Sequence, residues 1–389
     1  MSKGEIKCHG NCITCGKCNN FRILDQYAQS GTAHEPREGY GIAIDIGTTT
    51  VVLTLVDLTI GTTLARHSFL NPQRKFGPDV ISRIDAANKG HLDELTQAIK
   101  TDTASAVREL LKTEDILPES ITQMAIAGNT TMIYLLLGLS CESLGVQPFK
   151  PAFPVNDSYT CASLFDIPGV SCDVFVLPYL AAFIGGDITA GLLHTMAFSK
   201  QQFLLLDLGT NGEMGLYKNG ELIVTATAAG PAFDTIGRGG ASGVISVLAN
   251  MLSKGDIDES GFLCTESSDL SQTQVRELQL AKSAVRTGVE ILIKESGLSY
   301  DDLEALYLAG GIGQAIDVSD ACAIGLIPSE LENKAISVGN VALGGAVSLL
   351  LAPGKQWRVV ENLLASAKEI NLSTHRDFSD FYMDFMFFE

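Results

Sequence analysis

The chain has 389 residues, of which 46% are hydrophobic, and its formal net charge at pH 7 is −18. This length and apolar content predict roughly two or three domains with substantial cores, and the acidic balance argues against non-specific binding to nucleic acids or anionic membranes. The N-terminal residues MSKGEIKCHGNC lack the apolar segment of a secretory signal peptide. The sequence has no run of about 18 apolar residues, so no transmembrane helix is expected. We therefore expect a cytoplasmic protein that binds neither nucleic acid nor membrane.

Four cysteines gather at the start of the chain, in the segment KCHGNCITCGKCNN with the spacing C-x3-C-x2-C-x2-C. Such a tight group in a cytosolic chain indicates metal binding rather than disulfide bonds. Structural zinc sites usually pair two C-x2-C units across a spacer of about a dozen residues or more, whereas closely spaced cysteines are typical of iron–sulfur clusters. The pattern favours a 4Fe–4S cluster over a 2Fe–2S cluster, with zinc as the alternative because thiolates bind both metals. The predicted ligands are Cys8, Cys12, Cys15 and Cys18.

Composition divides the chain into four parts. Residues 1–20 form the cysteine-rich segment, and the polar residues 21–39 predict a linker. Residues 40–198 predict a first lobe and residues 199–389 a second lobe with a C-terminal tail, because alternating strand and helix patterns in both predict α/β layers. The other five cysteines are scattered, and we expect them to be small buried hydrophobic residues.

One short motif occurs twice, once in each lobe. Residues 41–50 read GIAIDIGTTT and residues 203–213 read FLLLDLGTNGE, so each apolar strand ends in Asp-x-Gly-Thr. Each copy is followed by a second apolar strand, a turn and a third strand, and the second turn, Asn219-Gly220, is a strong hairpin signal. A repeated hairpin that carries an acid implies two similar lobes facing each other with a nucleoside triphosphate between them. Ordinary hairpin turns are the alternative.

The residue types in the two copies suit phosphate and magnesium. Glycine lets the backbone approach phosphate oxygens closely, and successive N–H groups in such a turn form an anion-binding concavity. An aspartate cannot bind phosphate itself and is expected to hold Mg²⁺ through water. We therefore predict that Asp45 and Asp207 organise Mg²⁺, and that Glu213 either orients water or is a solvated acid at the start of a strand. The predicted phosphate contacts are Gly47, Thr48, Thr49, Gly209, Thr210, Asn211 and Gly212.

Two further motifs follow the first copy. In residues 126–132, IAGNTTM, Asn129 opens a helix after a strand and is either the helix cap or a donor to the site. Further along, Gly185-Gly186-Asp187 opens another helix. A helix N-terminus accepts aspartate simply as a cap, so capping is one role for Asp187.

The second lobe continues with glycine-rich and helical segments. Residues 228–243 are rich in glycine, and residues 272–296 predict a long amphipathic helix. Residues 303–313, LEALYLAGGIG, predict a strand that ends in glycines, and residues 339–351 predict a helix that opens with glycine. The tail carries aromatic residues at helical spacing, which predicts a helix docked on the core rather than a partner groove. These aromatic residues are Phe378, Phe381, Tyr382 and Phe385.

These motifs, in this order, resemble those of the superfamily of sugar kinases, heat-shock chaperone ATPases and actin. The matching positions are phosphate loop one at 45–49, the first connecting helix at 185–195, phosphate loop two at 207–213, the adenosine motif at 308–313 and the second connecting helix at 339–346. The resemblance implies an α/β, two-lobed actin-like ATPase fold of duplicated ribonuclease H-like domains, with ATP and Mg²⁺ between the lobes. Related ATPases often place a water-positioning acid where Asp187 stands, so Asp187 is either catalytic or a cap.

The same resemblance implies how the adenosine is held. Gly310, Gly311 and Gly313 would let the backbone pass close to the adenosine. By similarity to the chaperone ATPases, Lys282 and Arg286 on the long amphipathic helix would stack on the adenine or bond to it. On the residues alone, the alternative is that both are ordinary exposed helix charges.

The segments IAGNTTM, AAGPAF, LAGGIG, GLIP and GNVALGGA, together with the aromatic tail, resemble the ATP-dependent reductive activators of corrinoid proteins. In that family an iron–sulfur domain precedes an ATPase that couples nucleotide binding and hydrolysis to one-electron reduction of inactive Co(II) corrinoid to Co(I). The resemblance therefore implies a corrinoid protein as partner, an external electron donor, and electron transfer through the N-terminal cluster. The chain departs from the best-known members because it carries only the short cysteine segment in place of a full ferredoxin domain.

Three alternative functions stay open on the sequence. The target could be another low-potential metalloenzyme in place of a corrinoid protein. The chain could be a small-molecule kinase of the same superfamily with a structural zinc, for which Asp187 is the candidate catalytic acid. It could also be a chaperone-like or scaffold ATPase without redox chemistry. A homodimer that shares one cluster is compatible with the four cysteines but is not required by them.

Overall fold

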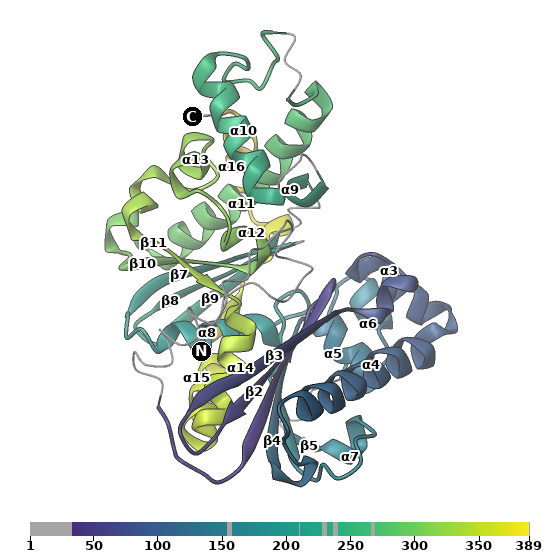
Figure 1. The fold of residues 1–389 in the computed structure, drawn as a ribbon. Coiled ribbons are helices and arrows are strands. Elements are labelled where there is room, and N and C mark those ends of the chain that lie inside the picture. Colours follow the sequence, from purple (N-terminus) through teal and green to yellow (C-terminus); the bar gives the residue numbers. More distant parts are fainter. Residues whose placement is uncertain are drawn as a thin grey trace, which may run out of the picture.

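The computed structural model describes residues 33–153, 158–209, 211–227, 232–235, 240–265 and 269–388. The four predicted cluster cysteines, most of the predicted linker and Thr210 lie outside the described residues. The described chain folds around two six-stranded mixed sheets, one in each predicted lobe (Figure 1). Among the helices described, none combines the length and the apolar character needed to cross a membrane.

The first sheet has the strand order β3-β2-β1-β4-β6-β5. Its strand β1 pairs antiparallel with β2 and parallel with β4. The run of apolar residues in β1 is buried on both faces, as expected for a central strand covered on both sides. The strands are β1 (Tyr40–Ile46), β2 (Thr50–Asp57), β3 (Thr62–Leu70), β4 (Ile121–Gly128), β5 (Ser158–Thr160) and β6 (Asp173–Val176).

Helices of the first lobe cover one face of this sheet. Leu95, Ile99 and Val107 lie on one stripe of α4 and share a core with Ile44 of β1, as the spacing of apolar residues on an amphipathic helix predicts. The helices of this lobe are α3 (Val80–Ala86), α4 (Leu92–Thr113), α5 (Thr130–Leu137), α6 (Glu142–Gly145) and α7 (Cys161–Leu164).

The second sheet, with the order β11-β10-β7-β8-β9-β12, repeats the arrangement of the first. Its strand β7 pairs antiparallel with β8 and parallel with β10, as β1 does with β2 and β4. The hairpin between β8 and β9 turns at Asn219 and Gly220, whose φ angles of 51° and 100° confirm the predicted Asn-Gly turn. The strands are β7 (Gln202–Leu208), β8 (Gly212–Lys218), β9 (Glu221–Thr227), β10 (Ala305–Ala309), β11 (Ala335–Gly339) and β12 (Ala367–Glu369).

The long amphipathic helix predicted in the second lobe is confirmed as α11 (Gln272–Ser296). Ser271 and Gln274 form a capping box at its start, and Gly297 ends it with φ of 66°. Shorter helices complete this lobe: α9 (Ala232–Thr235), α10 (Gly240–Lys254), α12 (Gly310–Gly313) and α13 (Val318–Ala323). The predicted α/β class with two similar lobes is therefore confirmed.

Two helices, one from each half of the sequence, lie between the sheets, and each packs on the sheet of the other half (Figure 1). Ile188 and Leu192 of α8 (Gly186–Met196) share a core with residues of the second sheet. Leu343 and Ala346 of α14 (Val341–Leu351) share a core with residues of the first sheet. A boundary near residue 198 therefore assigns each strand to its own sheet, but it places α8 and α14 in the half of the sequence opposite to the sheet on which each packs.

Glycines let α8 and α14 approach until their backbones touch. A Cβ atom added to Gly345 would lie 2.0 Å from the carbonyl oxygen of Ala190, and one added to Gly191 would lie 2.8 Å from Cγ2 of Val341. Real side chains cannot occupy such positions without separating the helices. The joint between the two halves thus depends on glycine at this crossing.

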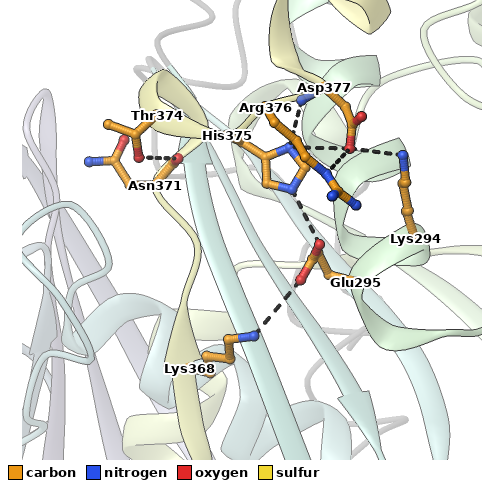
Figure 2. Close-up of polar contacts among 8 residues, drawn as sticks. All are labelled: Lys294, Glu295, Lys368, Asn371, Thr374, His375, Arg376 and Asp377. Atoms are coloured by element: carbon orange, nitrogen blue, oxygen red, sulfur yellow. Dashed lines mark hydrogen bonds and ion pairs between the residues drawn. The ribbon is translucent and has the colours of Figure 1, made fainter.

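The C-terminal segment runs through α15 (Pro353–Ser366) to α16 (Phe378–Asp384), which packs along α11. Phe378 and Phe381 pack against the core of the second lobe, which confirms the predicted docked tail. Polar contacts fix the residues just before α16 (Figure 2): Lys294 donates to Asp377 at 2.8 Å, and His375 Nε2 lies 3.3 Å from Glu295. Hydrogen bonding from Lys294 lowers the pKa of the Asp377 carboxyl.

The scattered cysteines differ in exposure. Cys141, Cys161 and Cys322 are buried as expected. The same expectation is wrong for Cys172, which is partly exposed, and for Cys264, which is exposed.

We predict that Gly345→Ala destabilises the fold, because the added methyl group would meet the Ala190 carbonyl and separate α8 from α14. Overpacking of this kind typically costs about 1–3 kcal/mol. Gly354→Ala in α15 is the matched control, because an added Cβ there meets nothing within 4 Å. Replacing a helical glycine by alanine should raise the free energy of unfolding by about 0.5–1 kcal/mol. Urea unfolding measures both changes. Equal free energies of unfolding for the two variants would contradict a glycine-dependent helix crossing.

Candidate active site

Four carboxylates from four elements of both lobes come close together. Asp45 lies near the end of β1 and Asp207 near the end of the equivalent strand β7. Asp187 lies in the first turn of α8, and Glu213 near the start of β8. The charges of Asp45 and Asp187 act on Asp207, and those of Asp187 and Asp207 act on Glu213. The structure therefore brings together all three predicted catalytic acids and Glu213.

These carboxyl groups are partly accessible to solvent but are strongly desolvated by the surrounding protein. Burial raises the pKa of Asp45 to about 6 and the pKa values of Asp187 and Asp207 to about 7. The values for Asp187 and Asp207 include a smaller contribution from the neighbouring negative charges, and burial also raises the pKa of Glu213. Such a group of buried acids is stable as anions only if a cation balances the charge.

Asp45 has two partners that favour its charged form. Nδ2 of Asn340 donates to Oδ2 of Asp45 at 2.7 Å, and the positive charge of Arg66 also lowers the pKa of Asp45. Asn340 is the N-cap of α14, where its side chain accepts the N–H of Leu343 at 2.8 Å. The start of α14 is thereby tied to the acid of the first sheet. The sequence analysis missed Asn340, and its position at the start of a helix, directly after Gly339, was the available signal.

Side chains from three elements hold the first phosphate loop. Asn71 donates to the Gly47 carbonyl at 2.9 Å, and Arg83 donates to the Thr48 carbonyl at 2.6 Å. Asn129 caps α5 and also donates to Oγ1 of Thr48 at 3.0 Å, so both alternatives for Asn129 are correct. No pattern in the sequence distinguished Asn71 or Arg83, because their contacts with the loop are set by the fold.

The loop glycines use their own N–H groups inside the turns. The N–H of Gly47 donates to the Thr50 carbonyl at 3.1 Å, and the N–H of Gly209 donates to the Asn211 carbonyl at 3.0 Å. A contribution of these two glycines to phosphate binding would therefore come from their missing side chains. A Cβ atom added to Gly209 would have its nearest neighbour at 3.9 Å, so this glycine borders open space.

The remaining residues predicted at the loops are spread around this space. Thr49 is exposed, and its carbonyl accepts the N–H of Asn71 at 2.9 Å. Gly212 is buried at the start of β8, where an added Cβ would lie 3.1 Å from the side chain of Thr227. Thr210 lies outside the described residues.

The glycines of α12 lie against the second acid. Gly310 has φ of 80°, and an added Cβ would lie 2.3 Å from Oδ1 of Asp207, so this position requires glycine. An added Cβ at Gly311 would meet nothing within 4 Å, whereas Gly313 is buried against Leu308. The start of α12 therefore approaches Asp207 and leaves space beside Gly311.

For the acids Asp187 and Glu213, one alternative each from the sequence is wrong. The N-cap of α8 is Gly185, whereas Asp187 is the second residue of the helix and accepts the N–H of the next residue at 2.9 Å. Glu213 is not a solvated strand-start acid, because it lies opposite Asp207 in the β7–β8 ladder and burial raises its pKa. Its carboxylate accepts a hydrogen bond from Asn211 at 3.4 Å.

Lys282 and Arg286 of α11 lie under the C-terminal segment. Their exposed fractions are 1% and 6%, so the alternative of ordinary exposed helix charges is wrong. Lys282 donates to the Phe387 carbonyl and lies 5.0 Å from the ring centre of Phe388. Arg286 lies 4.7 Å from the ring centre of Phe385. The C-terminal segment therefore contacts both cations, and their contact with an adenine stays a prediction.

Comparison with known proteins identifies the two lobes. The family model described as the RACo middle region matches residues 40–200. The model described as the C-terminal domain of RACo, the ASKHA domain, matches residues 201–241 and 265–389. Together these matches include both sheets and all four carboxylates.

Two curated proteins and one solved structure are similar over most of the chain. The corrinoid activation enzyme RamQ of Eubacterium limosum is 31% identical, over 93% of this chain and 72% of RamQ. The [Co(II) methylated amine-specific corrinoid protein] reductase of Methanosarcina barkeri is 25% identical, over 88% of this chain and 76% of the reductase. A solved structure described as a reductive activator for corrinoid, iron–sulfur protein is 29% identical, with a TM-score of 0.77, over 91% of this chain and 67% of that one.

The raised pKa values predict that the chelator-treated protein loses stability as the pH rises. Aspartates in an unfolded chain titrate near about pH 4, whereas Asp187 and Asp207 have pKa values of about 7 in the fold. Between these values the folded state binds more protons, so the free energy of unfolding falls as the pH rises. Asp187→Asn combined with Asp207→Asn should remove this contribution.

The measurement is the Tm of both proteins in excess chelator from about pH 5 to about pH 8. The Tm of the wild type minus the Tm of the double variant should fall as the pH rises. A difference that does not change with pH would contradict the electrostatic description of the site.

Proposed function

The chain belongs to the RACo family, the reductive activators of corrinoid proteins, and from this membership we propose that it uses ATP to reduce the Co(II) corrinoid of a partner protein to Co(I). One relative is named a corrinoid activation enzyme and another a reductase of a Co(II) corrinoid protein. Co(II) is difficult to reduce with ordinary donors, so nucleotide binding must favour one state of the partner over another. The observation that carries the proposal is the pair of Asp-x-Gly-Thr hairpins with their converging carboxylates, in a chain of this family.

We propose that these carboxylates hold Mg²⁺ on the phosphates of ATP. The donor set fits, because Mg²⁺ prefers oxygen ligands, keeps several waters and takes only one or two carboxylates. Asp45 and Asp207 stand at equivalent positions of the two sheets and are the proposed ligands through water. When bound, Mg²⁺ would neutralise charge on the phosphates and thereby assist their transfer. Asp187 and Glu213 are the proposed acids that orient the attacking water, and the charge of Asp187 acts on Glu213.

The remaining contacts follow from the loops around these acids. Hydroxyl and amide groups of the loops would donate to phosphate oxygens, and the glycines would leave room for the nucleotide. The proposed donors are Thr48, Thr49, Thr210 and Asn211, and the proposed glycines are Gly47, Gly209, Gly212, Gly310, Gly311 and Gly313.

We propose that the electron passes through an iron–sulfur cluster bound by Cys8, Cys12, Cys15 and Cys18. The support is the spacing of these cysteines, which suits a 4Fe–4S cluster. An external donor would reduce the cluster. Residues 1–20, 21–39, 40–198 and 199–389 are the proposed cluster segment, linker, first lobe and second lobe. A flexible linker would let the cluster approach a partner's corrinoid.

Asp45→Asn and Asp207→Asn should each lower Mg²⁺-dependent ATP hydrolysis by about 10²-fold or more, because each removes a charge that holds the cation. Asp85→Asn is the matched control: it makes the same chemical change at an exposed residue paired with Lys89, and it should leave hydrolysis unchanged. Phosphate release at saturating Mg-ATP measures the rates. If all three variants hydrolyse ATP like the wild type, the two acids are structural.

Anaerobically purified protein should be brown and contain iron and acid-labile sulfide. Cys12→Ala combined with Cys15→Ala should remove both, because the cluster would lose half of its protein ligands. Cys264→Ala, at an exposed cysteine of the second lobe, is the control and should retain both. Stoichiometric zinc without sulfide would exclude the proposed electron path.

Reduction of a Co(II) corrinoid protein by an artificial low-potential donor tests the whole proposal. With Mg-ATP present, the absorption band of Co(I) should appear faster than without it, because the nucleotide changes how the partner's two states are bound. Asp207→Asn should remove the effect of ATP. If ATP leaves the rate unchanged for several corrinoid proteins while a small metabolite becomes phosphorylated, the kinase alternative replaces the proposal.

A further inference from the structure

Two cysteines of the first lobe face each other at the edge of its sheet. The edge strand β5 pairs antiparallel with β6, and the last pair in their register is Thr160 with Asp173. Cys161, the first residue of α7, follows β5 directly and Cys172 directly precedes β6, and the N–H of Cys161 donates to the Cys172 carbonyl at 2.9 Å. The two residues are therefore directly opposite each other in the continuation of the ladder.

This placement fits a disulfide without rearrangement of the backbone. Directly opposite residues of an antiparallel pair have Cα atoms about 4.5–5.5 Å apart, and disulfides span about 4.4–6.8 Å between Cα atoms. Both cysteines are free thiols in the structure, and the two thiol groups form a side-chain hydrogen bond. The side chains thus already point toward each other.

A small reagent can reach this pair from solvent. Cys161 has an exposed fraction of 1%, whereas Cys172 is partly exposed. Both line an open surface recess of about 300 Å³, together with Thr122, Thr160 and Asp173. The hydrogen bond between the two thiols lowers the pKa of Cys161 and raises the pKa of Cys172, so Cys161 is the thiol whose thiolate form is favoured and which suits the second, resolving step.

We propose that Cys161 and Cys172 form a reversible thiol–disulfide site that exchanges with small-molecule disulfides. This site lies in the ATPase lobe and is separate from the N-terminal four-cysteine segment. It would give the protein a two-electron redox site in addition to the one-electron path proposed for corrinoid reduction. The inference does not depend on that proposed function.

The exchange takes place in two steps. Cys172, the more accessible of the two, first gives up its proton and attacks a small-molecule disulfide as the thiolate, which breaks the S–S bond of the reagent, forms a mixed disulfide and releases one small thiolate that takes up a proton. The Cys161 thiolate then attacks the Cys172 sulfur, forms the protein disulfide and releases the second small thiol. The two cysteines lose two electrons and two protons in total, and the reagent gains both.

The test is peptide mapping of the wild-type full chain after equilibration with mixtures of oxidised and reduced glutathione. Free thiols are alkylated in acid, and the digest is analysed by mass spectrometry. The expected product is a peptide pair linked by Cys161 and Cys172 that returns to two free thiols as the share of reduced glutathione rises. Cys264, which is exposed and distant in the fold, should carry a glutathione adduct under the same conditions.

Two variants separate the proposed site from general cysteine reactivity. In Cys161→Ser, Cys172 should retain glutathione as Cys264 does, because the thiol that displaces it is gone. Cys264→Ser should leave the linked peptide unchanged. The proposal is overturned if wild-type Cys161 and Cys172 are both alkylated in every mixture that modifies Cys264, or if Cys172 carries only the glutathione adduct. The wild-type mapping decides the outcome even if Cys161→Ser does not fold.

Discussion

The repulsion among four desolvated carboxylates is the interaction on which the rest of the structure depends. Asp45 and Asp207 reach the same region because β1 and β7 occupy equivalent places in two similar sheets, and α8 adds Asp187 to them. The protein balances this charge only in part, through the Asn340 amide and Arg66. A fold that concentrates uncompensated acids at the joint between its lobes is most stable when a cation occupies that place. The arrangement of the lobes should therefore respond to the Mg-nucleotide that they hold.

Contacts at this joint connect the acids to both sheets. The backbones of α8 and α14 touch through Gly345 and Ala190, and each helix covers the sheet of the other half. Asn340 connects the start of α14 directly to Asp45. A change at the acids thus acts on both helices and, through them, on both sheets. Close-packed contacts of this kind shift between discrete arrangements rather than deform continuously, which is what coupling between nucleotide and partner requires.

Much of the fold could be predicted from the sequence, because its main features are local. The duplicated Asp-x-Gly-Thr strands, the Asn219-Gly220 turn and the amphipathic pattern of α11 each depend on neighbouring residues. Contacts between distant segments could not be predicted in this way. The bond from Asn340 to Asp45 joins residues 295 positions apart, and Lys282 is buried by a segment that lies 105 positions further along the chain. Sequence patterns of apolar and charged residues report which face is buried, but not which segment covers it.

The central claim is that one site couples Mg-ATP to recognition of a Co(II) corrinoid protein. The most direct test is calorimetric titration, in which the Kd of a non-hydrolysable Mg-ATP analogue is measured with and without the partner, and the Kd of the partner with and without the analogue. Because coupling free energies are mutual, both Kd values should change by the same factor, of about 5-fold to 150-fold. If each ligand binds with the same Kd whether or not the other is present, nucleotide and partner are not coupled and the account is wrong.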